Sequence, residues 1–154
     1  MILLAVLLSL GPTAPLADVA AFALACERQP RCHELAAIAW AETGYRRHSK
    51  SSKGACCYMG ILGGRYDNPT CRELEADPDL CLSVAVRELE YWQRHCGKWY
   101  LDSYNMGWRG CLSRPPKNKD DKRCTVDCDS YTRKVRATQK RIEAATELLE
   151  GMEW

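Results

Sequence analysis

The sequence predicts a mostly helical, single-domain protein held together by several disulfides. Three observations lead to this fold class. Apolar residues recur at helical spacing in several segments, ten cysteines are spread along the chain, and its 154 residues are enough to bury one hydrophobic core. No internal repeat or low-complexity segment divides the sequence, so we expect one domain over residues 26–150.

The first segment is typical of a secretory signal. Residues 1–10 are almost wholly apolar, and small residues and turn formers follow as far as Ala17. A stretch of this length is too short to span a membrane. No Lys or Arg precedes it, although such signals usually carry one. We expect residues 1–17 to be a signal peptide, with cleavage after Ala17 or Ala21 favoured over Ala25, and an uncleaved N-terminal anchor as the alternative.

The cysteine count supports export to the periplasm or the extracellular space. An even number of cysteines behind a signal-like segment is typical of a disulfide framework formed in an oxidising compartment. Neighbouring Cα atoms lie about 3.8 Å apart, below the usual disulfide range of about 4.4–6.8 Å. Cys56 and Cys57 should therefore pair with different partners, and the other pairings stay open. The sequence has no C-x-x-C spacing and its histidines are scattered, so we expect neither a metal nor another cofactor.

Helical spacing and capping signals define the first expected elements. A helix is expected at 31–43, with Leu35, Ile38 and Ala39 on its buried face. Residues 44–70 carry five glycines and should form a long irregular loop with a small hairpin or a helical turn.

The second half of the chain carries three further expected helices. Asp79 can cap a helix that runs to about His95, and a short helix covers 98–105. An exposed loop is expected at 114–123. The last helix begins at Asp129 or Ser130 and buries one apolar stripe, formed by Tyr131, Val135, Thr138, Ile142, Ala145 and Leu149.

Composition narrows the function classes. The formal net charge of +2 is too close to neutral to indicate a nucleic-acid partner. Five Trp and seven Tyr stand against a single Phe. Such rings stack on sugars in wet grooves and also lie at core edges. No Ser-His-Asp or Cys-His arrangement and no phosphate-binding glycine loop can be supported.

Glu42 is the best candidate for a catalytic general acid. It follows the apolar run 36–41 and precedes Gly44, which can stop a helix. Partial desolvation raises the pKa of a carboxyl group, so Glu42 could act as a general acid near neutral pH. A helix-end Glu pointing into water is the alternative interpretation. Most glycosidases need two carboxylates, whereas one acid suffices when the substrate supplies its own nucleophile.

Five short sequence motifs follow one another over about 100 residues in an order and spacing known from one protein family. Glu42-Thr43 ends a helix and Gly44-Tyr45 follows; residues 54–61 match a loop of the form G-A-x-G-L-M-Q-I; and Asp77-Pro78-Asp79 opens a helix. Residues 103–107 match A-Y-N-x-G, and 131–135 match Y-x-x-K-V. In this order and spacing the chain resembles the catalytic domain of soluble lytic transglycosylases, which are related in fold to goose-type lysozymes.

The resemblance implies a lysozyme-like fold and cleavage of the β-1,4 bond between N-acetylmuramic acid and N-acetylglucosamine in peptidoglycan. Glu42 would be the acid/base, and attack by the muramic acid C6 hydroxyl would give a 1,6-anhydro product. Met59 would form part of the groove wall, and Tyr131 would hydrogen-bond near Glu42. The substrate-binding residues implied in this way are Thr43, Tyr58, Met59, Tyr104, Asn105 and Tyr131.

Two positions depart from the family pattern. Cys57 replaces a glycine and Gly60 replaces a glutamine whose amide would contact substrate. The alternatives are a hydrolysing lysozyme that uses Asp67 as a second carboxylate, and a non-catalytic glycan-binding or inhibitor module on the same scaffold. In each case we expect a monomer whose partner is the peptidoglycan glycan strand, with no nucleic acid and no stable membrane span.

Overall fold

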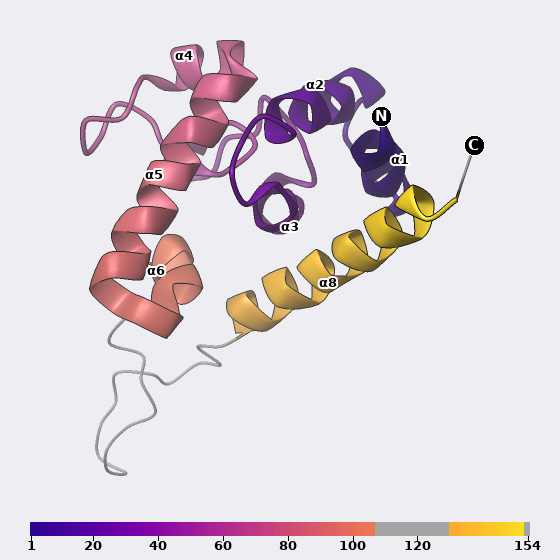
Figure 1. The fold of residues 1–154 in the computed structure, drawn as a ribbon. Coiled ribbons are helices and arrows are strands. Elements are labelled where there is room, and N and C mark those ends of the chain that lie inside the picture. The colour runs from indigo at the N-terminus through magenta and orange to yellow at the C-terminus, as the bar shows by residue number, and fades with distance from the viewer. Residues whose placement is uncertain (107–129, 153–154) are drawn as a thin grey trace. The chain divides into compact units, whose positions relative to one another are not determined.

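The computed structural model describes residues 1–106 and 130–152, and these are mostly helical, as predicted (Figure 1). One antiparallel pair of two-residue strands accompanies the helices. Within the described ranges, no helix combines the length and the apolar character needed to cross a membrane. The elements are α1 (Ile2–Ser9), α2 (Leu16–Cys26), α3 (Cys32–Thr43), β1 (Ala55–Cys56), β2 (Ile61–Leu62), α4 (Cys71–Ala76), α5 (Pro78–Cys96), a 3-10 turn (Gly97–Trp99), α6 (Tyr100–Met106) and α8 (Ser130–Glu150).

The chain forms two compact units. Unit 1 comprises Met1–Ala85 together with Val135–Trp154, and unit 2 comprises Val86–Lys134. Helices α5 and α8 each contribute residues to both units.

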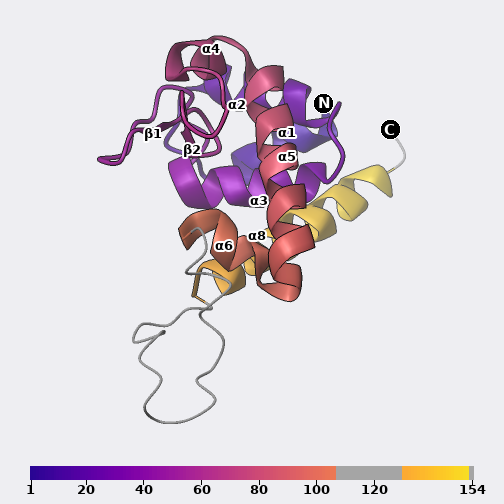
Figure 2. The same cartoon turned by 90° about the vertical axis from the view of Figure 1, so that its left-hand side faces the viewer.

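Helix α3 supplies the centre of the unit 1 core. Its residues 35–39 are wholly buried, which confirms the predicted burial of Leu35, Ile38 and Ala39. The alanines on this helix allow neighbouring elements to approach closely. Three aromatic rings of the same unit pack on one another: the Phe22 ring lies 5.1 Å from that of Tyr45 and 5.4 Å from that of Tyr58. Figure 2 shows α3 together with the small hairpin and α2.

The predicted boundaries of α3 hold to within one residue. The helix begins at Cys32, after Arg31 in the left-handed conformation, and ends where Gly44 takes the same conformation at φ 59°. The Gly44 N–H then bonds the Trp40 carbonyl at 3.2 Å. A helix that ends on a left-handed glycine satisfies one of its last carbonyls in this way.

The expected cap of the next long helix is wrong, and the short helix before it was missed. Asp77, not Asp79, caps α5, because its Oδ1 accepts from the Leu80 N–H at 3.1 Å. Asp79 instead pairs with Arg28. The missed helix is α4, which begins with a capping box in which Thr70 and Glu73 bond each other's backbone N–H.

Helices α6 and α8 agree with the prediction in outline. Val135, Thr138 and Ile142 are buried, as the stripe on the last helix predicted. Thr146 completes the stripe in place of Ala145 and Leu149, which are half-buried. Its hydroxyl bonds a carbonyl one turn earlier, at 2.9 Å, so a polar residue can be buried there. The expected loop at 114–123 and the expected cap at residue 129 lie outside the described residues.

Three disulfides join described cysteines, all in unit 1. They connect Cys26 to Cys32, Cys56 to Cys71, and Cys57 to Cys81. The prediction that Cys56 and Cys57 take different partners is confirmed. Cys96 is also disulfide-bonded.

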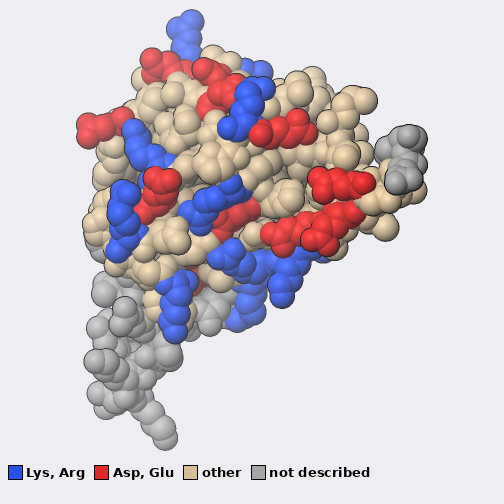
Figure 3. All heavy atoms as spheres, in the orientation of Figure 1, with Lys and Arg blue, Asp and Glu red and all other residues tan. Residues whose placement is uncertain are grey.

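One acidic side chain ties α3 to α8 within unit 1. Glu34 is only 4% exposed, and its Oε2 accepts from Arg31 at 2.6 Å while its Oε1 accepts from Arg136 at 3.1 Å. Both arginines keep partial access to water, so each remains hydrated while the carboxylate is satisfied by the pair. On the face drawn in Figure 3, acidic and basic side chains are interleaved over much of the surface, in keeping with the small net charge.

Replacing Glu34 with Ala should lower the free energy of unfolding by about 1–3 kcal/mol, because buried charge-assisted hydrogen bonds are lost. Thermal or denaturant unfolding measures this change. Arg28→Ala is the matched control, since it removes an ion pair that is exposed on both sides, and its midpoint should equal that of the wild type. Equal midpoints for Glu34→Ala and the wild type would contradict a structural role for Glu34.

Candidate functional site

Glu42 lies in the last turn of α3 and is half-buried. The five residues 35–39 anchor the preceding turns of the helix in the core. Gly44 ends the helix directly afterwards, so the carboxyl group lies where the helix meets the long loop over residues 44–70.

The loop backbone approaches the Glu42 carboxyl group closely at Gly60. A Cβ atom added to Gly60 would lie 2.9 Å from Glu42 Oε2 and 3.3 Å from its Cδ. Real Cβ atoms do not come this close to other heavy atoms, so a side chain at position 60 would displace the carboxyl group. Gly60 also has φ +65°, a conformation that favours glycine. Both facts account for a glycine where the family pattern has glutamine.

Thr43 ties the end of α3 to the same loop. Its hydroxyl oxygen lies 2.9 Å from the Tyr58 carbonyl oxygen and 3.2 Å from the Ala39 carbonyl oxygen. The hydroxyl has one proton, so it donates to one of these two carbonyl oxygens at a time. The bond to Tyr58 spans fifteen residues of sequence and fixes the loop two residues before Gly60.

Tyr58 and Met59 are fully buried, with 0% exposure. The Tyr58 hydroxyl donates to the Asp18 carbonyl at 3.1 Å and its ring packs against Phe22. Burial raises the pKa of Tyr58 to about 12, and the Asp18 charge adds to this while Arg47 opposes it. Burial also raises the pKa of Tyr45, whose hydroxyl donates to the Ala36 carbonyl at 3.0 Å. In this structure Tyr58 and Met59 therefore face the interior.

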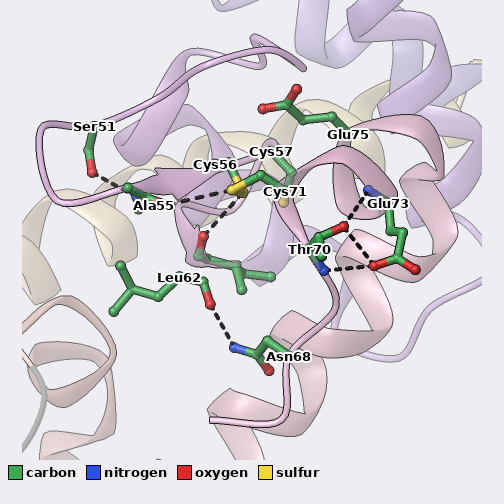
Figure 4. Close-up of a disulfide and its surroundings, with 12 residues drawn as sticks. Ser51, Ala55, Cys56, Cys57, Leu62, Asn68, Thr70, Cys71, Glu73 and Glu75 are labelled. Atoms are coloured by element: carbon green, nitrogen blue, oxygen red, sulfur yellow. Dashed lines mark hydrogen bonds between the residues drawn. A yellow bond between two sulfur atoms is a disulfide. The ribbon is translucent and has the colours of Figure 1, made fainter. Parts of the chain in front are cut away.

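Two disulfides attach the loop to the rest of unit 1. Figure 4 shows Cys56 bonded to Cys71, at the start of α4, and Cys57 beside it. Cys57 is bonded to Cys81 on α5. Its φ of 56° lies in the left-handed region, which favours glycine, the residue that the resembled pattern has at this position. Cys56 and Cys57 therefore anchor the loop three and two residues before Met59, on the β1 side of the hairpin turn.

The remaining predicted site residues belong to unit 2. Tyr104 is half-buried and Asn105 exposed on α6, and Tyr131 is half-buried in the first turn of α8. The two helices are joined by a hydrogen bond of 2.7 Å from the Thr132 hydroxyl to the buried Asp102 carboxylate. The structure thus brings Tyr104, Asn105 and Tyr131 onto two connected helices. Their approach to Glu42 stays a prediction.

Among the described residues, two other carboxyl groups can be compared with Glu42. Glu34 is more buried than Glu42, but both of its oxygens are bound by arginines, which suits a structural carboxylate. Asp67, the expected second carboxylate of a hydrolase, lies in an exposed turn. Among the described residues, no group of three or more His, Cys, Asp or Glu could hold a metal ion.

A hollow of about 230 Å³ lies at the other end of α3, between Arg31, His33 and Glu143. This end is about 15 Å from Glu42, at 1.5 Å per helical residue. The hollow is lined by charged and polar groups and contains none of the predicted site residues.

Sequence reasoning missed the contact between Gly60 and Glu42. The missing glutamine at position 60 was a departure from a pattern, and only the fold shows that the glycine adjoins the acid. Glu34 and Asp18 were also missed. For Glu34 a signal was present, since Arg31 precedes it at helical i,i+3 spacing.

No protein-family model matches the chain, and neither a curated protein nor a solved structure is similar enough to count as a match.

The raised pKa of Tyr58 predicts a loss of stability in alkali. The unfolded chain releases this proton near pH 10, whereas the folded protein holds it to about pH 12. The stabilising contribution is therefore complete below pH 10 and is lost as the pH rises towards 12, and Tyr45 acts in the same direction. Unfolding midpoints measured from pH 8 to 11.5 should fall steeply above pH 10.

Tyr45→Phe with Tyr58→Phe should flatten that fall, although it also lowers stability at neutral pH by about 0.5–1.5 kcal/mol for each lost hydrogen bond. Tyr66→Phe is the control, because Tyr66 is 81% exposed and should leave the profile unchanged. An alkaline profile that is identical in the double variant and the wild type would show that these tyrosines do not carry the effect.

Proposed function

We propose that this chain is an exported, lysozyme-like enzyme that cleaves peptidoglycan as a lytic transglycosylase. The observation that carries the proposal is the half-buried Glu42 carboxyl group, held at a helix end with the Gly60 backbone against it. The loop backbone at position 60 therefore lies directly beside the carboxyl group. Pre-positioning of an acid is what proton transfer to a glycosidic oxygen requires.

The proposed reaction uses Glu42 twice. Protonated Glu42 gives its proton to the oxygen of the β-1,4 bond, so that the N-acetylglucosamine side leaves. The resulting carboxylate then takes the proton of the muramic acid C6 hydroxyl as this oxygen attacks the anomeric carbon of the same sugar. The product is a 1,6-anhydro sugar, no water is consumed, and Glu42 ends in its starting protonation state.

The surroundings of Glu42 support a one-acid mechanism over hydrolysis. A hydrolase needs a second carboxylate to activate water or form a covalent intermediate. Glu34 is held between two arginines and Asp67 is exposed in a turn. Because position 60 has no side chain, the loop backbone lies next to the acid in place of a glutamine side-chain amide.

Thr43, Tyr58 and Met59 take positioning roles in this proposal. Thr43 and Tyr58 bond the loop to the end of α3 and to α2, and buried Met59 leads directly into Gly60. For Tyr104, Asn105 and Tyr131 of unit 2, the roles in sugar binding stay those that the resemblance implies.

Glu42→Gln should lower turnover of purified peptidoglycan by about 10²–10⁴-fold, because general acid–base assistance contributes this much. Thermal unfolding should stay close to wild type, since Gln keeps the shape of Glu. Glu147→Gln is the control, a helical and exposed glutamate, and should leave turnover unchanged.

Mass spectrometry of the digest identifies the reaction. Anhydro-muropeptides from the wild type support the proposal, and hydrated reducing ends sensitive to Asp67→Asn would replace it with a hydrolase. Saturable binding without any cleavage would replace it with a glycan-binding module. Turnover by Glu42→Gln near that of the wild type would remove Glu42 from the mechanism.

Gly60→Ala should separate positioning of the acid from stability of the loop. Gly60 and Gly64 have nearly equal φ values of +65° and +67°, but a Cβ at Gly64 meets no atom within 4 Å. Both alanine variants should lose about 1 kcal/mol of unfolding free energy from left-handed strain. Only Gly60→Ala displaces the Glu42 carboxyl group, and a misplacement of about 1 Å can cost 10²-fold in rate.

We therefore expect about a 10–100-fold loss of turnover in Gly60→Ala and little change in Gly64→Ala, with similar unfolding midpoints. Equal turnover in the two variants would show that the contact between Gly60 and Glu42 has no part in positioning the acid.

A further inference from the structure

Helix α2 belongs to the core of unit 1, although it lies within the region where signal cleavage was expected. Val19, Phe22, Ala25 and Cys26 are all 0% exposed. The Phe22 ring packs on both Tyr45 and Tyr58. The helix is further bonded to the rest of the unit by the disulfide between Cys26 and Cys32.

Asp18 bonds the start of this helix to the functional loop. Its Oδ2 accepts from the Arg47 backbone N–H at 3.1 Å, and its carbonyl accepts from the Tyr58 hydroxyl at 3.1 Å. Tyr58 in turn lies two residues from Gly60, which adjoins Glu42. Loss of Asp18 would leave the buried Tyr58 hydroxyl without its acceptor, and an unsatisfied buried polar group is costly.

The segment before Asp18 is attached differently. Helix α1 is made of apolar residues and buries Leu3, Val6 and Leu7. Its described polar contact to another element is the exposed ion pair of the Met1 amino group with Glu27. Pro15, directly before α2, and Leu16 and Ala17, in its first turn, are all exposed.

Three cleavage positions stayed open from the sequence. All three cuts remove α1 and also Thr13, whose hydroxyl accepts from Arg46 at 2.8 Å, so only the contacts of residues 18–25 distinguish the three positions. A cut after Ala21 removes Asp18 and its two hydrogen bonds, and a cut after Ala25 also removes Phe22 from the aromatic cluster. A cut after Ala17 keeps Asp18, Phe22 and Cys26. Signal cleavage precedes folding, so the criterion is what the mature chain needs to fold and not which bond is accessible in the folded protein.

We propose that a signal-peptidase-type endopeptidase cuts this chain between Ala17 and Asp18. Water adds across that peptide bond: its hydroxyl goes to the Ala17 carbonyl carbon and its hydrogen to the Asp18 nitrogen. Residues 1–17 leave with a new carboxylate, and the mature chain begins with the α-amino group of Asp18. Ala17 supplies the small residue directly before the cut, whereas Pro15 stands at the second small position of the A-x-A-like pattern, which Ala23-Leu24-Ala25 matches more closely. This proposal is independent of sugar cleavage.

The test uses the full chain with a C-terminal tag, expressed in a bacterial host that exports and processes signal peptides. Intact mass and N-terminal sequencing of the periplasmic protein should give Asp18 as the first residue. A first residue of Phe22, Leu24 or Cys26, or a chain that still starts at Met1, would overturn the proposal. Ala17→Arg should abolish the Asp18 terminus, and its persistence would also count against the site.

A second comparison tests the reason for the position. Phe22→Ala should lower the yield of folded, exported protein several-fold, because the aromatic cluster of the mature fold loses its central ring. Leu24→Ala is the matched control on the same helix, since Leu24 is 60% exposed. Equal yields from the two variants would show that the mature fold does not need α2, and the argument for a cut before Asp18 would fail.

Discussion

The close approach of a loop backbone to one carboxyl group is the constraint on which the rest of this account depends. Gly60 can lie against Glu42 only because it has no side chain and takes a left-handed conformation. The loop is kept there by a hydroxyl bond from Thr43 and by two disulfides on adjacent cysteines. Together, the glycine backbone, the hydrogen bond and the disulfides hold the loop next to the Glu42 carboxyl group.

The attachments of the loop form a chain from the N-terminal region to the acid. Phe22 and Asp18 of α2 hold Tyr58, Tyr58 and Thr43 hold the loop, and the loop holds Glu42 through Gly60. Buried tyrosine hydroxyls with backbone acceptors make this arrangement specific, because each unpaired group would carry a penalty. A secreted protein with a small core commonly adds disulfides to such a framework.

The helical fold class, the burial on α3 and the separate partners of Cys56 and Cys57 could be predicted because periodicity and chain geometry are local properties. The capping of α5 could not, since Asp77 and Asp79 are both suitable caps and the choice depends on Arg28, which is distant in sequence. Helix α4 was missed because six residues carry little periodicity, although Thr70 and Glu73 have the spacing of a capping box. The role of Gly60 required the fold, because a glycine carries no sign of its neighbour. Approach of Tyr104, Asn105 and Tyr131 to Glu42 remains a prediction from the resemblance.

The most direct measurement of the central claim is a crystal structure of the Glu42→Gln variant with a peptidoglycan tetrasaccharide bound. The account predicts that a β-1,4 glycosidic oxygen lies about 3 Å from the side chain at position 42. A tetrasaccharide bound elsewhere, such as the hollow beside Arg31 and His33, with position 42 empty of sugar, would contradict it.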